Sequence, residues 1–126
     1  MVVEDDPFSK DFYHYILAKA GYNPILVEDG DEFVRRIKDG GISLIIMDIN
    51  LKNTYLEGEK TNGVTLSQII KNDPMLSTVP ILLVTAYSQS AEGNKYFHES
   101  LADDYISKPI IDYKALVSKI NNLVIN

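Results

Sequence analysis

Short apolar segments alternate with longer amphipathic segments along the whole chain. The apolar segments are rich in β-branched residues and have the length of strands, at 2–3, 25–27, 42–48 and 79–85, and a further short strand is predicted at 104–107. Between them, apolar residues recur every three or four positions, which is the spacing of an amphipathic helix. This spacing predicts helices at 7–20, 31–38, 64–72, 88–101 and 112–124.

Start and stop signals frame the first of these helices. Asp6 is a candidate N-cap, Pro7 stands at the first helical position, and Gly21 follows the end. These residue types are favoured at the corresponding positions of helix termini. The helical spacing places a group of mostly aromatic residues near one stripe, namely Phe8, Phe12, Tyr15, Ile16 and Lys19.

The strand and helix segments alternate five times. Regular alternation of this kind predicts an α/β fold, with a parallel sheet, helices on both faces and right-handed crossovers. The segment at 42–48 is apolar throughout, as in a parallel strand covered on both faces, whereas the polar stretch at 50–62 is predicted to be a loop. Ligands bind such sheets beyond the carboxyl ends of the strands, so residues at strand ends are the candidates for chemistry.

Composition and charge restrict the class of protein. The chain has 126 residues, of which 45% are hydrophobic and 24% charged, which is typical of a globular domain. Its net charge of −6 argues against a general nucleic-acid binder, and the lack of cysteine excludes disulfides, thiolate zinc sites and cysteine nucleophiles. No apolar run is long enough to span a membrane, and acidic residues follow Met1 where a signal peptide would be basic. We therefore expect a cytoplasmic protein with one domain, residues 1–126.

The residues at the predicted strand ends form a chemically coherent set. The first strand ends at Glu4 and Asp5, the third at Asp48, the fourth at Thr85 and the fifth at Lys108. In a parallel sheet these side chains lie along one rim. Two carboxylates about 4 Å apart repel by roughly 4 kcal/mol at an effective dielectric near 20, so such a rim favours a cation. Oxygen ligands without sulfur or imidazole suit Mg²⁺.

A carboxylate at such a rim can act as a nucleophile toward phosphorus. Lys108 and Mg²⁺ would neutralise charge on the phosphoryl oxygens during transfer, and Thr85 could donate a hydrogen bond to one of them afterwards. Each residue also has a structural interpretation, because Thr85 could cap a helix and the acids before Pro7 favour a helix N-terminus. These interpretations do not explain why acids, a hydroxyl and a lysine fall at four strand ends.

Four motifs in this order resemble the receiver domain of two-component response regulators. They are Val3-Glu4-Asp5-Asp6-Pro7, Leu44-Ile45-Ile46-Met47-Asp48-Ile49-Asn50, Leu83-Val84-Thr85-Ala86 and Asp103-Asp104-Tyr105-Ile106-Ser107-Lys108-Pro109. The resemblance covers essentially the whole chain. It implies a flavodoxin-like fold with a five-stranded parallel sheet in the order 2-1-3-4-5.

The resemblance also implies roles for the strand-end residues. Asp48 would be the phosphoacceptor, and Lys108 would pair with the phosphoryl group. Asp5 would bind Mg²⁺ directly, Glu4 would act through water, and Asn50 would offer its backbone carbonyl to the metal. The phosphoryl group would come from a sensor histidine kinase or a histidine phosphotransfer protein.

Further positions would transmit or time the signal. Thr85 would move toward the phosphate and Tyr105 would change rotamer with it, so that the face from the fourth strand to the fifth helix alters its binding to a partner or a tethered effector. Asn50 and Tyr87 would flank the path of hydrolytic water, and Tyr87 is expected to slow self-hydrolysis. The domain would catalyse only its own phosphorylation and dephosphorylation.

Three features depart from the family pattern. The stretch after Asp48 is several residues longer than in most relatives, which we interpret as a tolerated surface insertion in preference to a partner-specific element. Leu101 stands where many relatives have glycine. The first strand is short for a central strand and could be truncated at its N-terminus.

An enzyme remains as the alternative function. Asp48 could be the nucleophile of a small phosphohydrolase acting on a diffusible substrate. Enzymes of that kind usually place a second acid two residues after the nucleophile, and here that position is Asn50, which cannot titrate. A receiver-like module that binds without phosphorylation is disfavoured by the complete residue set. The cognate kinase, the pathway and the oligomeric state are left open.

Overall fold

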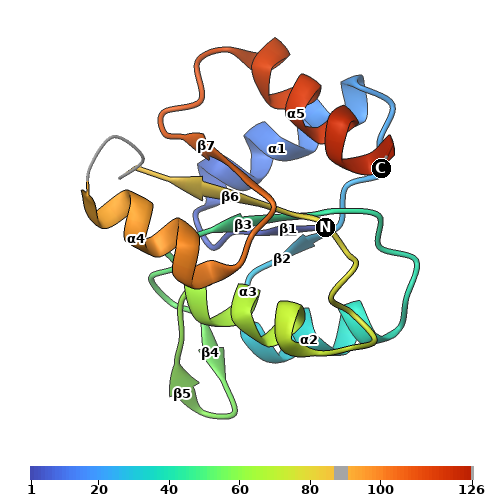
Figure 1. Cartoon of the computed structure of the whole chain (residues 1–126). Coiled ribbons are helices and arrows are strands. Elements are labelled where there is room, and N and C mark those ends of the chain that lie inside the picture. The colour runs from blue at the N-terminus through green and yellow to red at the C-terminus, as the bar shows by residue number, and fades with distance from the viewer. Residues whose placement is uncertain (87–90, 126) are drawn as a thin grey trace.

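Five parallel strands form the centre of the computed structural model, which describes residues 1–86 and 91–125 (Figure 1). They are β1 (Val2–Val3), β2 (Leu26–Val27), β3 (Ile45–Asp48), β6 (Ile81–Thr85) and β7 (Asp104–Ser107). The strand order is β2-β1-β3-β6-β7, and each neighbouring pair is parallel. The sequence-based prediction of a flavodoxin-like sheet in the order 2-1-3-4-5 is confirmed.

Helices cover both faces of this sheet (Figure 1). They are α1 (Pro7–Lys19), α2 (Gly30–Lys38), α3 (Gly63–Asn72), α4 (Ala91–Ser100) and α5 (Tyr113–Ile125). One core cluster joins α1 and α5 to one face of the sheet, and the other joins α2 and α3 to the opposite face. Along β6, alternate residues enter the two clusters, since Leu82 belongs to the first and Leu83 to the second. Burial on both faces explains why β6 is apolar from Ile81 to Val84.

Helix α1 begins as predicted but buries a different face. The Asp6 side chain accepts a hydrogen bond of 2.9 Å from the Ser9 backbone N–H and so caps the helix. The buried residues are Tyr13, Ile16 and Leu17, whereas Phe8 is 85% exposed. Aromatic residues occur on several sides of this helix, so spacing alone did not identify the side that faces the sheet.

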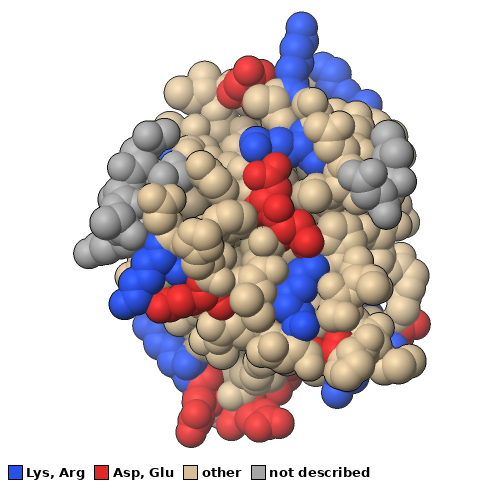
Figure 2. Space-filling model, in the orientation of Figure 1, with Lys and Arg blue, Asp and Glu red and all other residues tan. Residues whose placement is uncertain are grey.

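The segment predicted as a loop after β3 contains a small hairpin. Its strands are β4 (Tyr55–Leu56) and β5 (Glu59–Lys60), and they pair with each other but not with the main sheet. The two turn residues, Glu57 and Gly58, have φ values of 52° and 82°, and positive φ at both positions is typical of a two-residue hairpin turn. The hairpin projects from the molecule (Figure 1), at an end where acidic side chains are exposed (Figure 2).

The end of α4 requires an unusual backbone conformation. Leu101 follows the helix with φ of 63°, in the left-handed region that favours glycine. The side chain is 48% exposed, so it contributes only part of its apolar surface to the core. This conformation explains why a glycine is suited to the position.

Gly63 brings the start of α3 against the end of β3. A Cβ atom at this position would lie 2.1 Å from the backbone oxygen of Asp48 and 3.0 Å from Cα of Ile49. The Gly63 N–H also donates to the Ile49 carbonyl at 3.4 Å. Helix α3 and the end of the central strand therefore approach so closely that no side chain fits between them.

Replacing Gly63 with alanine should destabilise the fold. Alanine in place of glycine favours a helix by up to about 1 kcal/mol. Forcing an extra methyl group into a packed site costs roughly 1–3 kcal/mol, and here the neighbour is backbone that cannot rotate away. We expect the Gly63→Ala variant to unfold at a lower urea concentration than the wild type. An unchanged or higher midpoint would show that the strand end and the helix can separate freely.

Candidate functional site

Four polar side chains gather at the carboxyl ends of the parallel strands. Glu4 follows β1, Asp48 is the last residue of β3, Thr85 is the last residue of β6, and Lys108 follows β7. Asp48 lies opposite Val84 in the register of β3 and β6, so the ends of these strands are level. The parallel arrangement thus brings together residues that are far apart in the sequence.

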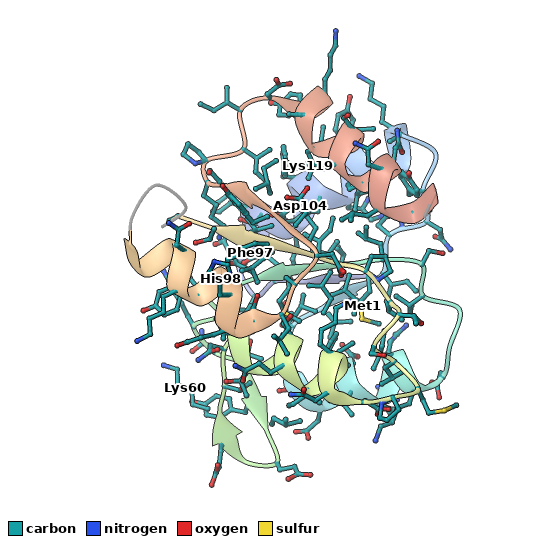
Figure 3. The ribbon with its side chains drawn as sticks, viewed as in Figure 1. Met1, Lys60, Phe97, His98, Asp104 and Lys119 are labelled. Atoms are coloured by element: carbon teal, nitrogen blue, oxygen red, sulfur yellow. The ribbon has the colours of Figure 1, made fainter. Side chains whose placement is uncertain are left out.

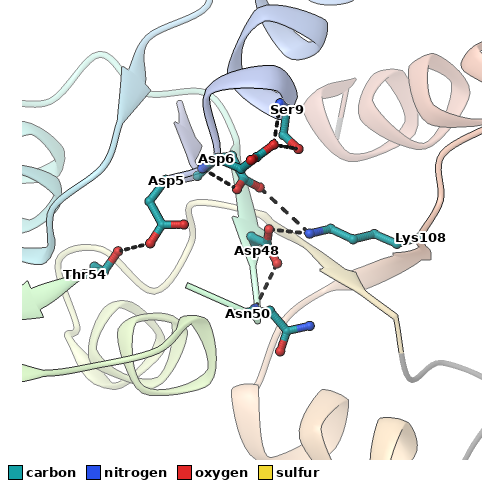
Figure 4. Close-up of polar contacts among 8 residues, drawn as sticks. Asp5, Asp6, Ser9, Asp48, Asn50, Thr54 and Lys108 are labelled. Carbon is teal, nitrogen blue, oxygen red and sulfur yellow. Dashed lines mark hydrogen bonds and ion pairs between the residues drawn. The ribbon is translucent and has the colours of Figure 1, made fainter. Parts of the chain in front are cut away.

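Lys108 is in direct contact with Asp48 (Figure 4). Its Nζ lies 2.5 Å from Oδ2 of Asp48 and 4.0 Å from Oε2 of Glu4. The Asp48 side chain is 2% exposed and that of Lys108 is 29% exposed. One ammonium group therefore faces two carboxyl groups that are almost completely removed from water.

The remaining oxygen of Asp48 also has a donor. The Asn50 backbone N–H donates to Oδ1 of Asp48 at 2.9 Å (Figure 4). The two oxygens thus contact different groups, the amide on one side and the lysine on the other. These contacts fix the orientation of the carboxylate at the strand end.

Glu4 is the most strongly perturbed acid in the site. Its Oε1 accepts a 3.0 Å hydrogen bond from the Asp6 backbone N–H, while Oε2 is buried and has no hydrogen-bond partner within the described part of the chain. Burial raises the pKa of Glu4 to about 8, and nearby Asp48 adds to this effect more than Lys108 opposes it. Burial and the neighbouring Asp48 thus both favour the protonated form of Glu4.

Asp5 is held by the chain that follows β3. Its Oδ2 accepts hydrogen bonds from the Asn53 backbone N–H at 2.8 Å and from Oγ1 of Thr54 at 3.1 Å. The other carboxylate oxygen faces the side on which Asp48 lies (Figure 4). No sequence signal marks Asn53 or Thr54 for this role, because their contact with Asp5 depends on how a long polar segment folds back.

Tyr13 is a second residue that the sequence analysis did not assign to the site. It comes from α1 and is 2% exposed. Its pKa is raised chiefly by burial and then by the charges of Asp48 and Glu4, so the phenol stays neutral beside the acids. The only signal in the sequence was its helical spacing from Ile16 and Leu17.

The proposed switch residues lie on neighbouring strands. Thr85 is 1% exposed at the end of β6, and Tyr105 is paired with Leu83 in the register of β6 and β7. The Tyr105 ring is 5.1 Å from that of Phe97, centre to centre, and 5.9 Å from Nζ of Lys119. Lys119 also contacts Asp104 at 3.2 Å (Figure 3). Tyr87, which was predicted to influence hydrolysis, lies outside the described residues.

The donor atoms at the strand ends fit a hard divalent cation. Among the described residues, no three Asp, Glu, His or Cys side chains lie close enough to form a complete metal cluster. Mg²⁺ does not require one, because it keeps several waters and takes few protein ligands. The available ligands are the carboxylates of Asp5 and Asp48. The buried Oε2 of Glu4 has no hydrogen bond among the described residues and lies 4.0 Å from Nζ of Lys108, so it could accept a hydrogen bond from a metal-bound water.

A comparison with protein families identifies the class of domain. Residues 1–121 match the model of the response regulator receiver domain. The chain belongs to this family. The described residues include no helix that is long and apolar enough to cross a membrane.

Relatives of the chain include a transcriptional regulator and the receiver domain of a histidine kinase. It is 28% identical over 120 residues to the phosphate regulon transcriptional regulatory protein PhoB of Klebsiella pneumoniae, a match that covers 95% of the chain and 48% of PhoB. The chain thus spans about half the length of that relative. It is 30% identical to the receiver domain of a signal transduction histidine kinase from Syntrophus aciditrophicus, with a TM-score of 0.83 over 98% of the chain and 86% of that domain.

A further solved structure has the same fold. The receiver domain of sensor histidine kinase PA1611 from Pseudomonas aeruginosa PAO1 has a TM-score of 0.83 and is 23% identical, over 99% of this chain and 95% of that one. That structure contains a magnesium ion coordinated in its active site cleft.

The pKa of Glu4 predicts a pH-dependent stability in metal-free buffer. The folded state retains the Glu4 proton up to about pH 8, whereas the ordinary pKa is 4.5, so the free energy of unfolding should fall as the pH rises through this window. One such proton contributes a slope of at most about 1.4 kcal/mol per pH unit. Glu4→Gln should reduce this pH dependence. Near pH 8 its free energy of unfolding should exceed that of the wild type.

Urea unfolding across this pH range measures the effect. Glu32→Gln is a matched control, because Glu32 is a partly exposed carboxylate on α2. It should retain the wild-type slope. Parallel pH profiles for the wild type and Glu4→Gln would contradict the prediction.

Proposed function

We propose that this receiver domain accepts a phosphoryl group on Asp48 in a Mg²⁺-dependent reaction. The donor is a phosphohistidine on a sensor histidine kinase or a histidine phosphotransfer protein. The observation that carries the proposal is the geometry of Asp48, which is nearly buried at a strand end with Lys108 on one oxygen and the Asn50 amide on the other. These contacts orient the carboxylate in a site from which most water is excluded.

The proposed reaction transfers a phosphoryl group from a histidine nitrogen to the Asp48 carboxylate. A carboxylate oxygen of Asp48 forms a bond to phosphorus as the bond from phosphorus to the histidine nitrogen breaks, and the imidazole leaves with that electron pair. Lys108 compensates the negative charge of the phosphoryl oxygens during transfer. The Thr85 hydroxyl then donates a hydrogen bond to the bound phosphoryl group.

Asp5, Asp48 and the Asn50 backbone carbonyl would hold the metal, with Glu4 acting through a water molecule. When bound, Mg²⁺ reduces the repulsion between these carboxylates and the phosphoryl oxygens. The all-oxygen set of donors and the buried Oε2 of Glu4 support this assignment. The magnesium ion in the cleft of the PA1611 receiver domain supports it as well.

Phosphorylation would change the surface through Thr85 and Tyr105. It adds roughly −1.5 to −2 charges beside Lys108 and draws the Thr85 hydroxyl toward the phosphate. Tyr105 would change rotamer together with Thr85. Its ring packs beside Phe97 and Lys119, so this change would alter the surface that these residues form. The face from β6 to α5 then presents a different surface to an effector, either tethered or separate.

Asp48→Asn should abolish labelling by acetyl phosphate. The wild type should be labelled when Mg²⁺ is present and lose labelling when the metal is chelated. Asp39→Asn replaces an exposed aspartate after α2 and should be labelled like the wild type. Phosphate incorporation followed by mass spectrometry measures all three proteins, and undiminished labelling of Asp48→Asn would exclude this acceptor.

The same preparation tests the alternative of a phosphohydrolase. Asn50 stands where such enzymes place a second acid, and an amide cannot transfer protons as a general acid does. We therefore expect each molecule to be modified once and then to release its phosphate slowly. Sustained release of phosphate from small phosphate esters over many turnovers would favour the enzyme instead.

A further inference from the structure

The hairpin segment, residues 53–60, is fastened to the start of α2. The Glu57 backbone N–H donates to both carboxylate oxygens of Asp31, at 3.1 and 3.3 Å. The Tyr55 backbone N–H lies 3.4 Å from Oδ1 of Asp29. An exposed insertion without a structural role needs no such attachment, so these bonds point to a defined position for the segment.

Gly30 shows how closely the hairpin segment packs on α2. A Cβ atom there would lie 2.6 Å from the backbone oxygen of Tyr55 and 3.1 Å from Cβ of Leu56. Leu56 itself is partly buried against the core cluster that includes α2 and α3. The hairpin segment therefore rests directly on the helix backbone, and even a methyl group would displace it.

The first residues of the hairpin segment reach the candidate site. The Asn53 N–H and the Thr54 hydroxyl both contact Oδ2 of Asp5. Thr54 is completely buried, and its Oγ1 also lies 2.8 Å from the backbone oxygen of Glu28. A hydroxyl has only one proton to donate, so Thr54 shares it between Asp5 and the chain after β2.

The two carboxylate oxygens of Asp5 have different surroundings. Oδ2 is occupied by two donors from the hairpin segment, while the other oxygen faces the side of Asp48 (Figure 4). A carboxylate that is fixed in this way loses little rotational freedom when it binds a cation. Groups that orient a metal ligand commonly contribute 10- to 100-fold to metal affinity.

We propose that the hairpin segment positions Asp5 for the divalent cation, with the Thr54 hydroxyl as the positioning group. This inference rests on the proposed function, because it concerns the same metal site. It replaces the interpretation of the long segment after Asp48 as a merely tolerated insertion. The docked hairpin thereby links the surface of α2 to the metal affinity of the site.

Thr54→Val tests this role with little change in side-chain volume. We expect the dissociation constant for Mg²⁺ to rise about tenfold, as measured by titration of backbone amide signals in NMR spectra of the unphosphorylated domain. Thr54→Ser keeps the hydroxyl and should bind Mg²⁺ nearly as the wild type does. Thermal unfolding in metal-free buffer identifies a variant that has simply lost its fold.

Thr61→Val is a matched control in the same segment of chain. The Thr61 hydroxyl is buried without a hydrogen-bond partner among the described residues, and its backbone N–H donates to the Thr54 carbonyl in a bond that valine retains. Thr61→Val should therefore bind Mg²⁺ with wild-type affinity. Gly30→Ala, which displaces the hairpin segment without touching Asp5, should weaken binding in the same direction as Thr54→Val.

The outcomes separate this inference from the proposed function. If the wild type binds no Mg²⁺ near Asp5, the proposed function itself is wrong. If the wild type binds Mg²⁺ while folded Thr54→Val binds equally or more tightly, only the positioning role is refuted. A folded Thr54→Ser variant as weak as Thr54→Val, or a Gly30→Ala variant with wild-type affinity, would also overturn that role.

Discussion

The contact between Lys108 and Asp48 is the interaction on which the rest of the site depends. The two residues are 60 positions apart, and they meet because β3 and β7 run parallel on either side of β6. Removing a carboxylate from water is costly unless a charged or hydrogen-bonding partner replaces the solvent. Lys108 and the Asn50 amide provide these partners for the buried Asp48 side chain at the end of β3.

Lys108 alone cannot neutralise both Asp48 and Glu4. Glu4 lies farther from Nζ of Lys108 than Asp48 does, and its Oε2 has no hydrogen-bond partner within the described chain. The site consequently contains more acidic groups than its single ammonium can neutralise, and this imbalance raises the pKa of Glu4 in addition to the effect of burial. A divalent cation at the strand ends, as proposed, would supply the positive charge that this set of acids lacks.

The convergence of the site could be predicted from the sequence, because it follows from a simple geometric rule. Asp48, Thr85 and Lys108 each come at or just after a segment predicted to be a strand, and parallel strands place their carboxyl ends on one edge. The contacts of Asp5 could not be predicted in this way. They depend on Thr54, which belongs to a hairpin whose strands of two residues are too short to give an alternating pattern. The turn at Glu57 and Gly58 also lacks the stronger Asn-Gly or Asp-Gly signal.

The close approach of Gly63 to Asp48 determines how the segment between β3 and α3 can vary in length. The chain leaves β3 at Asp48 and returns to nearly the same point when α3 begins, where the Gly63 N–H bonds to the Ile49 carbonyl. The fourteen positions from Ile49 to Asn62 therefore form a closed excursion, with its exit and return fixed against each other. Such an excursion can lengthen or shorten without moving Asp48 relative to α3. This architecture lets the length of the segment change while the contact between the end of β3 and the start of α3 is kept.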